Sequence, residues 1–147
     1  MHLIIRIFTM VVIDGKDCVL GRVATYAAKA ALEGESVSII NAGELVIIGD
    51  KNNIVNKYRE LLEMGTMAKG PFPPRTVEGI VKRTIRGMLH RKTPKGRDAL
   101  RRVRVYQGVP EELKASPSLT VAKMRRDKPI HKVKIAELSN ILKYREV

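Results

Sequence analysis

The stretch VVIDGKDCVLGRVATYAAKAALEGESVSII (residues 11–40) decides the fold that the sequence predicts. It opens with the β-branched run 11–13 and a turn signal at Asp14-Gly15, and it closes with a second strand over 37–40. Between them, apolar side chains recur at helical spacing, and Gly34 stands where a helix usually ends. A strand, a helix and a strand, with continuously apolar strands, are typical of a parallel sheet that helices cover through right-handed crossovers.

The residues up to 74 continue this alternation. A third apolar run covers 45–48, and Asp50 suits the N-cap of a helix over roughly 51–64, which ends at Gly65. The segment 66–74 contains three prolines, which prevent regular structure. It is either a plain connector or a rigid loop that tucks into a partner.

The basic block, residues 75–104, carries most of the net positive charge of the chain. It holds 11 of the 28 Lys and Arg residues and two acidic residues, so its net formal charge is +9 out of +13 for the chain. Residues 1–74 have no net charge. A neutral body with one dense cationic block indicates a folded platform that presents positive charge to a polyanion. The alternative is a solvated basic surface without a dedicated partner, which self-repulsion at this density disfavours.

Two helices are predicted within the basic block. The first begins near Thr76, with Lys82, Arg83 and Arg86 opposite its apolar face. A turn over 90–96, set by Pro94 and Gly96, separates it from a second short helix over 97–102, and the alternation of residues 103–106 then predicts a strand. The apolar face of the first helix consists of Val77, Ile80, Val81, Thr84, Ile85 and Met88.

The two ends of the chain are less regular. Residues 111–128 are polar and include a basic cluster at 123–126, and an amphipathic helix is expected from about Ile135. Residues 1–9 are an extra strand, a tail or an over-long start, and Met10 is an alternative initiator. Without an internal repeat or a low-complexity tract, we expect one domain over 1–147.

Several function classes are disfavoured by what the sequence lacks. Two Phe, four Tyr and no Trp make aromatic base stacking an unlikely main mode of binding. The single cysteine, Cys18, forms no internal disulfide, no Cys/His group has zinc spacing, and the segment before Asp14 does not look like a secretory signal. No apolar run reaches the roughly 20 residues of a membrane helix. We therefore expect a cytoplasmic protein without metal, cofactor or catalytic site, in which His90, among basic neighbours, suits phosphate contact better than proton transfer.

Two rival functions stay open at this point. The turn Gly15–Arg22 lies between a strand and a helix, as in nucleotide-binding enzymes and regulators, but it matches neither phosphate-loop pattern. Gly21 and Arg22 at a helix start could equally hold a phosphate of RNA. A binder of double-stranded DNA is the other rival, and it would normally show a recognition motif that this chain does not have.

Three strings resemble a known family. VVIDGKDCVLGRVAT (11–25), SIINAGELVIIGDK (38–51) and VKRTIRGMLHRKTPKGRDALRRVRVYQGVP (81–110) closely resemble the universal large-subunit ribosomal protein thirteen family in its archaeal form. The resemblance covers a shared core of residues 10–110, from about Val11 to Pro110, and leaves 1–9 as an extra segment. It identifies 111–147 as the C-terminal extension of the archaeal and eukaryotic branch. Many members carry Pro where this chain has His90, a departure that concerns the shape of the turn after residue 89.

The resemblance implies an α/β fold with three α/β/α layers around a mainly parallel four-stranded sheet. It also implies a non-enzymatic protein of the large ribosomal subunit that binds large-subunit rRNA, touches neighbouring ribosomal proteins and supports subunit assembly. Together with the charge pattern, it leads us to expect no cofactor, metal, membrane or small-molecule substrate. We expect contacts to RNA phosphates, rather than base readout, from Arg22, Lys82, Arg83, Arg86, Arg91, Lys92, Lys95, Arg97, Arg101 and Arg102.

Overall fold

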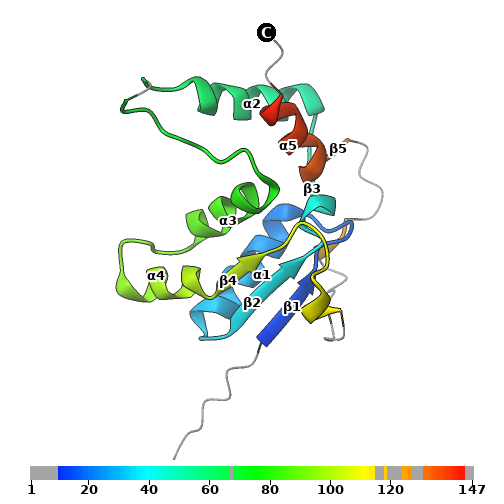
Figure 1. The fold of residues 1–147 in the computed structure, drawn as a ribbon, viewed down its shortest axis with the longest axis vertical. Coiled ribbons are helices and arrows are strands. Elements are labelled where there is room, and N and C mark those ends of the chain that lie inside the picture. Colours follow the sequence, from blue (N-terminus) through cyan, green and yellow to red (C-terminus); the bar gives the residue numbers. More distant parts are fainter. Residues whose placement is uncertain (1–9, 67, 115–117, 119–123, 127–130, 145–147) are drawn as a thin grey trace, which may run out of the picture.

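The centre of the fold is a parallel sheet of three strands, β1 (Met10–Asp14), β2 (Ser36–Ile40) and β4 (Val103–Val105), in the order β1-β2-β4 (Figure 1). The computed structural model describes residues 10–66, 68–114, 118, 124–126 and 131–144. In the sheet, Val11 pairs with Val37, which pairs on its other side with Val103. The prediction of a mixed α/β fold with a mostly parallel sheet is thereby confirmed.

One face of this sheet holds the main core. The inward side chains of the strands, such as Ile13, Ile39 and Val103, are fully buried there beneath helices α1 (Leu20–Leu32) and α3 (Val77–Met88). Because alanines line the buried side of α1, this helix lies close to α3 and to α4 (Pro94–Arg101). The sheet therefore supports α3 and α4, the two helices of the basic block.

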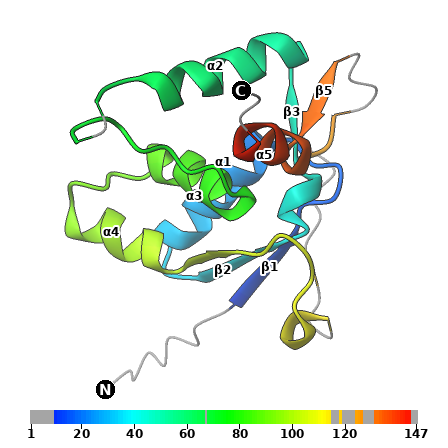
Figure 2. The same ribbon diagram turned by 45° about the horizontal axis from the view of Figure 1, so that its top comes forward.

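The opposite face of the sheet is covered by much less. Val12 and Ile40 form a small second cluster there with Leu113, which belongs to the short 3-10 helix η2 (Glu111–Leu113). Figures 1 and 2 both show this helix, in yellow, on the other side of the sheet from α3. The described residues thus form an asymmetric arrangement, with the helices concentrated on one face.

A second group of elements extends beyond the end of the sheet. The 3-10 helix η1 (Ala42–Glu44) leads into β3 (Val46–Ile48), which is followed by α2 (Lys51–Glu63). β3 pairs antiparallel with β5 (Lys132–Lys134), and α5 (Ile135–Lys143) follows directly. Three side chains of α5, Ile135, Leu138 and Leu142, are buried in the main core.

Local sequence patterns predicted most helices and strands, but they missed one strand, one helix start and the absence of one capping bond. β5 was not predicted, because Val133 stands alone between two lysines and gives no apolar run. The second basic helix begins at Pro94, not at residue 97, because proline fits the first turn of a helix, where its missing N–H has no partner to lose. Asp50 does occupy the N-cap of α2, but its side chain makes no capping hydrogen bond.

The anchoring face of α3 is shorter than its apolar pattern. Val77, Ile80, Val81 and Ile85 are buried as expected, whereas Met88 is 42 % exposed. Met88 lies at the end of the helix, where its sulfur accepts a hydrogen bond from the Thr25 hydroxyl of α1. Of the helices in the described part of the chain, none is long and apolar enough to cross a membrane.

Candidate nucleic-acid interface

Helix α3 holds three of the predicted cations on a rigid support. Lys82, Arg83 and Arg86 are all exposed, on the side of the helix opposite its buried residues. The helix start is fixed by Thr76, whose hydroxyl accepts a hydrogen bond from the Gly79 amide at 3.2 Å. The core therefore sets the backbone positions of Lys82, Arg83 and Arg86, while their side chains remain in solvent.

The turn between α3 and α4 is ordered by its own hydrogen bonds. The Thr93 hydroxyl donates to the His90 carbonyl at 2.8 Å, and the Arg91 amide donates to the Leu89 carbonyl at 2.9 Å. Arg91 and Lys92 are exposed in this turn, and so is His90. Two further predicted cations are thus presented by a fixed turn that joins the two helices.

Helix α4 is tied to this turn by a close backbone approach. The Gly96 amide donates to the Thr93 hydroxyl at 3.3 Å, which caps the helix. A Cβ atom at Gly96 would collide with the His90 carbonyl, so this position needs glycine. Lys95, Arg97 and Arg101 of α4 are exposed. The predicted cations from Lys82 to Arg101 are thus all exposed, on α3, on the turn and on α4, three elements that follow one another along the chain.

The remaining two predicted residues already bond to the chain's own backbone. The half-buried Arg102 donates to the Ala31 carbonyl at 3.0 Å, at the end of α1, and Arg22 donates to the Arg125 carbonyl at 3.0 Å. Both guanidinium groups therefore help to hold the fold. Each has further N–H groups, since a guanidinium carries five, so RNA contact remains compatible with these bonds.

Little negative charge offsets these cations. Within the basic block, the described ion pairs consist of Arg101 with Asp98, at 3.6 Å and in solvent. Such a pair contributes on the order of 1 kcal/mol or less, because water screens it. Lys82, Arg83 and Arg86 have no ion pair with any described acidic residue. An exposed, mostly uncompensated row of cations attracts a polyanion such as nucleic acid.

The rival nucleotide site is disfavoured by the turn between β1 and α1. The Gly15 amide donates to the Ile40 carbonyl at 2.9 Å, and the Val19 amide donates to the Met124 carbonyl at 2.8 Å. A phosphate-binding loop instead points such amides at its ligand. Two of this turn's donors are thus used within the fold.

Cys18 is a packing residue in the same turn. Its side chain is fully buried, and this burial raises the pKa of the Cys18 thiol above its ordinary value. A thiol that stays protonated is a poor nucleophile, so the position before a helix does not activate it. Among the described residues, no cluster of three or more His, Cys, Asp or Glu side chains could hold a metal ion.

Three further cations near this interface were not selected from the sequence. Lys57 and Arg59 of α2, and Arg75 just before α3, line cavities beside the Pro-rich segment. Lys57 and Arg59 lie in the neutral part of the chain, and only the fold brings α2 opposite the start of α3. A charge count along the sequence gives no signal for such a juxtaposition.

Comparisons with known proteins match most of the chain. The model of the family described as "Ribosomal protein L13" matches residues 9–112. The protein named large ribosomal subunit protein uL13 of Archaeoglobus fulgidus is 43 % identical over 142 residues, which cover 92 % of this chain and 89 % of the relative. Its namesake in Thermoplasma volcanium is 38 % identical over 133 residues, covering 90 % of this chain and 98 % of the relative. The protein of the same name in Methanosarcina barkeri is 46 % identical over 114 residues, which cover 77 % of this chain and 81 % of the relative.

Proposed function

Because the chain belongs to the ribosomal protein L13 family, we infer that it is a structural constituent of the large ribosomal subunit and works bound to the ribosome. It is accordingly a ribosomal structural component and not an enzyme. Its relatives are named as proteins of the large subunit, and this chain covers most of their length. The partners that follow from this are rRNA and other ribosomal proteins.

We propose that the surface formed by α3, the 89–93 turn and α4 contacts the phosphates of large-subunit rRNA. The observation that carries this proposal is the row of exposed cations, with few acidic neighbours, on helices whose other faces are buried in the core. Fixed cations suit a folded RNA, because the major groove of A-form RNA is too deep and narrow for side chains to read, so that paired RNA is recognised mainly through its backbone and shape. The proposed contacts are Lys82, Arg83, Arg86, Arg91, Lys92, Lys95, Arg97 and Arg101, with Arg22 and Arg102 in a combined structural role.

We also propose how the chain is organised into a domain and where it works. Burial of Ile135, Leu138 and Leu142 in the main core supports one domain over residues 1–147, with the C-terminal extension packed onto the 10–110 core. A fourth strand and a three-layer arrangement also stay a proposal, since β3 pairs with β5 in the described residues and meets the β1–α1 turn through a parallel bridge between Val19 and Val46. We further propose a cytoplasmic location, a role in subunit assembly, and contacts to neighbouring large-subunit proteins.

A triple substitution tests the phosphate contacts. We expect Arg83→Gln, Arg86→Gln and Lys92→Gln together to weaken binding to large-subunit rRNA and to flatten the dependence of log K on log salt by roughly 0.7 to 0.9 for each phosphate that is no longer neutralised. Binding is measured by filter retention between 50 and 300 mM KCl, about the range over which such slopes are resolved. An unchanged slope in the triple variant would contradict the assignment of contacts to this surface.

The assignment to the subunit is tested by sedimentation. The tagged protein should sediment with large subunits in a sucrose gradient and leave them only at high salt, because its contacts are mainly electrostatic. Recovery at the top of the gradient in low salt, with the tag accessible and the protein folded, would count against ribosomal assembly. Addition of nucleotides should not raise the melting temperature, whereas a nucleotide-binding protein would be stabilised.

A further inference from the structure

Helix α2 is only partly packed against the rest of the protein. Of its side chains, Val55 alone is buried, while Ile54, Tyr58 and Leu62 reach the edge of the core. The first turn of α2 is joined to α5 by an ion pair between Lys51 and Glu137. Figure 1 shows α2 across the top of the molecule, with α3 well below its C-terminal half.

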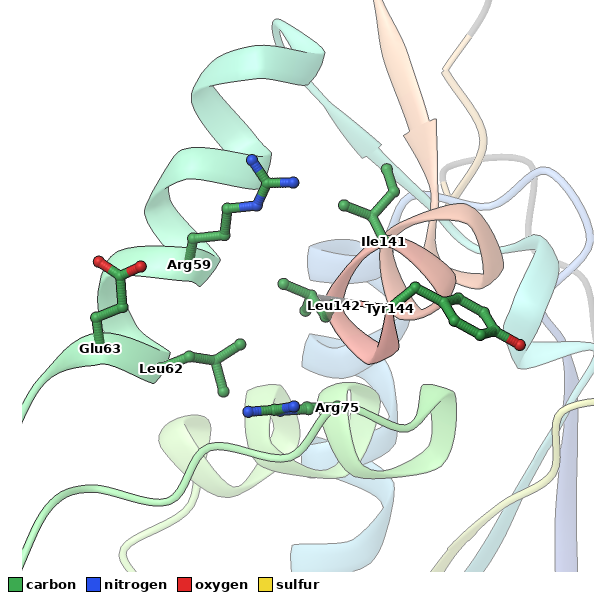
Figure 3. A pocket seen from close by; sticks show the side chains of 7 residues that line it. All are labelled: Arg59, Leu62, Glu63, Arg75, Ile141, Leu142 and Tyr144. Atoms are coloured by element: carbon green, nitrogen blue, oxygen red, sulfur yellow. The ribbon is translucent and has the colours of Figure 1, made fainter. Parts of the chain in front are cut away.

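A cavity of about 300 Å³ lies between α2, the segment before α3 and α5. Leu62, Ile141 and Leu142 give it apolar walls (Figure 3). Arg59 from α2 and Arg75 from the segment before α3 also line it, and in this view both guanidinium groups extend into the space between the elements. The cavity thus combines an apolar floor with cations from two separate elements.

The two arginines meet little opposing charge at this cavity. The buried Ser139 hydroxyl of α5 donates to the Arg75 carbonyl at 2.7 Å, which fixes the backbone of Arg75 beside the cavity. Neither arginine forms an ion pair with a described acidic residue. Glu63 is the one described acidic residue that lines the cavity, and in Figure 3 its carboxylate points away from Arg75.

This combination matches a nucleotide better than a protein side chain. A planar guanidinium fork bonds phosphate oxygens in pairs, so two arginines that line one cavity suit two successive phosphates of an RNA strand. The apolar floor would cover the face of an unstacked base, as in the recognition of unpaired RNA by proteins. A purely apolar protein side chain would leave the two cations without partners.

A second cavity extends the same chemistry towards the basic surface. It has a volume of about 190 Å³ and lies between α2, Pro73-Pro74 and α3, with Lys57 and Arg83 as its charged lining residues. Arg83 also belongs to the proposed contacts on α3. Cations of α2 thus line both cavities, Lys57 together with Arg83 in this one and Arg59 together with Arg75 in the other.

We propose that the cavity between α2 and α5 binds one unpaired nucleotide of large-subunit rRNA. Arg59 and Arg75 bind the two phosphates that flank this nucleotide, and Leu62, Ile141 and Leu142 cover its base. This inference rests on the proposed function and adds to it a site for an extruded base, beyond the contacts on α3 and α4. It also gives the Pro-rich segment a role, since this segment forms the boundary between the two cavities.

Three variants in one assay test the site on protein-free large-subunit rRNA of Archaeoglobus fulgidus, with the full chain. Arg59→Gln with Arg75→Gln should lower the affinity about tenfold and reduce the salt slope by roughly 0.7 for each arginine replaced. Arg104→Gln with Lys114→Gln removes the same charge from the opposite face of the sheet and should change the affinity less than twofold. Leu62→Trp fills the cavity without changing charge, so it should lower the affinity while the salt slope stays the same.

The outcomes separate this inference from the proposed function. An effect of the Arg83, Arg86 and Lys92 triple variant without an effect of the Arg59 and Arg75 double variant would keep the proposed function and overturn the nucleotide site. If the double variant binds naked rRNA normally but fails to enter large subunits, the occupant is a protein, which also overturns the proposal. Normal binding of Leu62→Trp would show that no base enters the cavity. Thermal melting confirms that each variant is folded, and Leu62→Phe replaces the tryptophan variant if that one melts early.

Discussion

Helices α3 and α2 have similar lengths and similar amphipathic patterns, yet they relate to the core in opposite ways. α3 buries Val77, Ile80, Val81 and Ile85, whereas α2 buries Val55 alone. α3 is also capped by a side chain, and α2 is not. A helical pattern therefore predicts a helix and its inward face, but the elements that surround the helix decide how much of that face is covered.

This contrast has a functional counterpart. On α3, complete burial of one side fixes the opposite side, so its cations form a rigid surface for a folded RNA. On α2, incomplete burial leaves cavities, and these cavities are lined by cations of α2 together with cations of neighbouring elements. The first arrangement suits the shape of a paired RNA backbone, and the second suits a single nucleotide that leaves its stack.

The largest effect on stability should come from the side chains that the two helices pack against the core. Ile85 of α3 is fully buried, so Ile85→Ala should lower the free energy of unfolding by about 2 to 5 kcal/mol. The matched change Ile54→Ala in α2 removes a half-buried side chain and should cost about 1 kcal/mol. Urea unfolding followed by circular dichroism measures both. Equal losses would mean that α2 contributes as much to the core as α3, and the contrast between the helices would fail.

How far the sequence predicts this molecule follows from the same distinction. Strands β1 and β2 and the helix between them are encoded by continuous local patterns, and so are the exposed cations of α3. The pairing of β3 with β5 is not encoded in this way, because Val133 stands between two lysines and forms a strand only through its pairing with residues 46–48. The bond from Arg102 to the Ala31 carbonyl likewise joins residues that are far apart along the chain, and only the fold places Arg59 and Arg75 along one cavity.

Substitutions at two glycines of the basic block test how rigid the backbone of α3, the 89–93 turn and α4 is. Gly96→Ala should lower the stability by about 1 to 3 kcal/mol, because the new methyl group meets the immovable His90 carbonyl. Gly87→Ala, on the open side of α3, meets no atom and should raise the stability by about 0.5 kcal/mol through its better helix propensity. Thermal melting of both variants shows whether the melting temperature falls for Gly96→Ala and rises for Gly87→Ala. A neutral Gly96→Ala would show that the turn before α4 shifts freely, in conflict with a fixed row of cations.

The two helix starts give the next smaller effect. Thr76→Ala removes the hydroxyl that accepts from the Gly79 amide and should cost about 1 kcal/mol. Asp50→Ala at the start of α2 removes no capping bond, so only the attraction of the carboxylate to the helix dipole is lost, at about 0.3 kcal/mol. Chemical denaturation at low and high salt resolves them, since salt should reduce only the Asp50 effect. A cost for Asp50→Ala that matches Thr76→Ala would indicate that α2 is capped as firmly as α3.

The weakest effect should come from the ion pair that joins α2 to α5. Lys51 and Glu137 are 54 % and 45 % exposed at their side chains, so water and ions screen their attraction. A double-mutant cycle with Lys51→Gln and Glu137→Gln should give a coupling of about 0.5 kcal/mol that falls further at high salt. Such a weak link fits an α2 that can adjust its distance from α5 when a nucleotide enters the cavity between them. A coupling above about 2 kcal/mol, insensitive to salt, would instead mean that α2 is fixed as rigidly as α3, and the two helices would then differ in burial but not in their freedom to move.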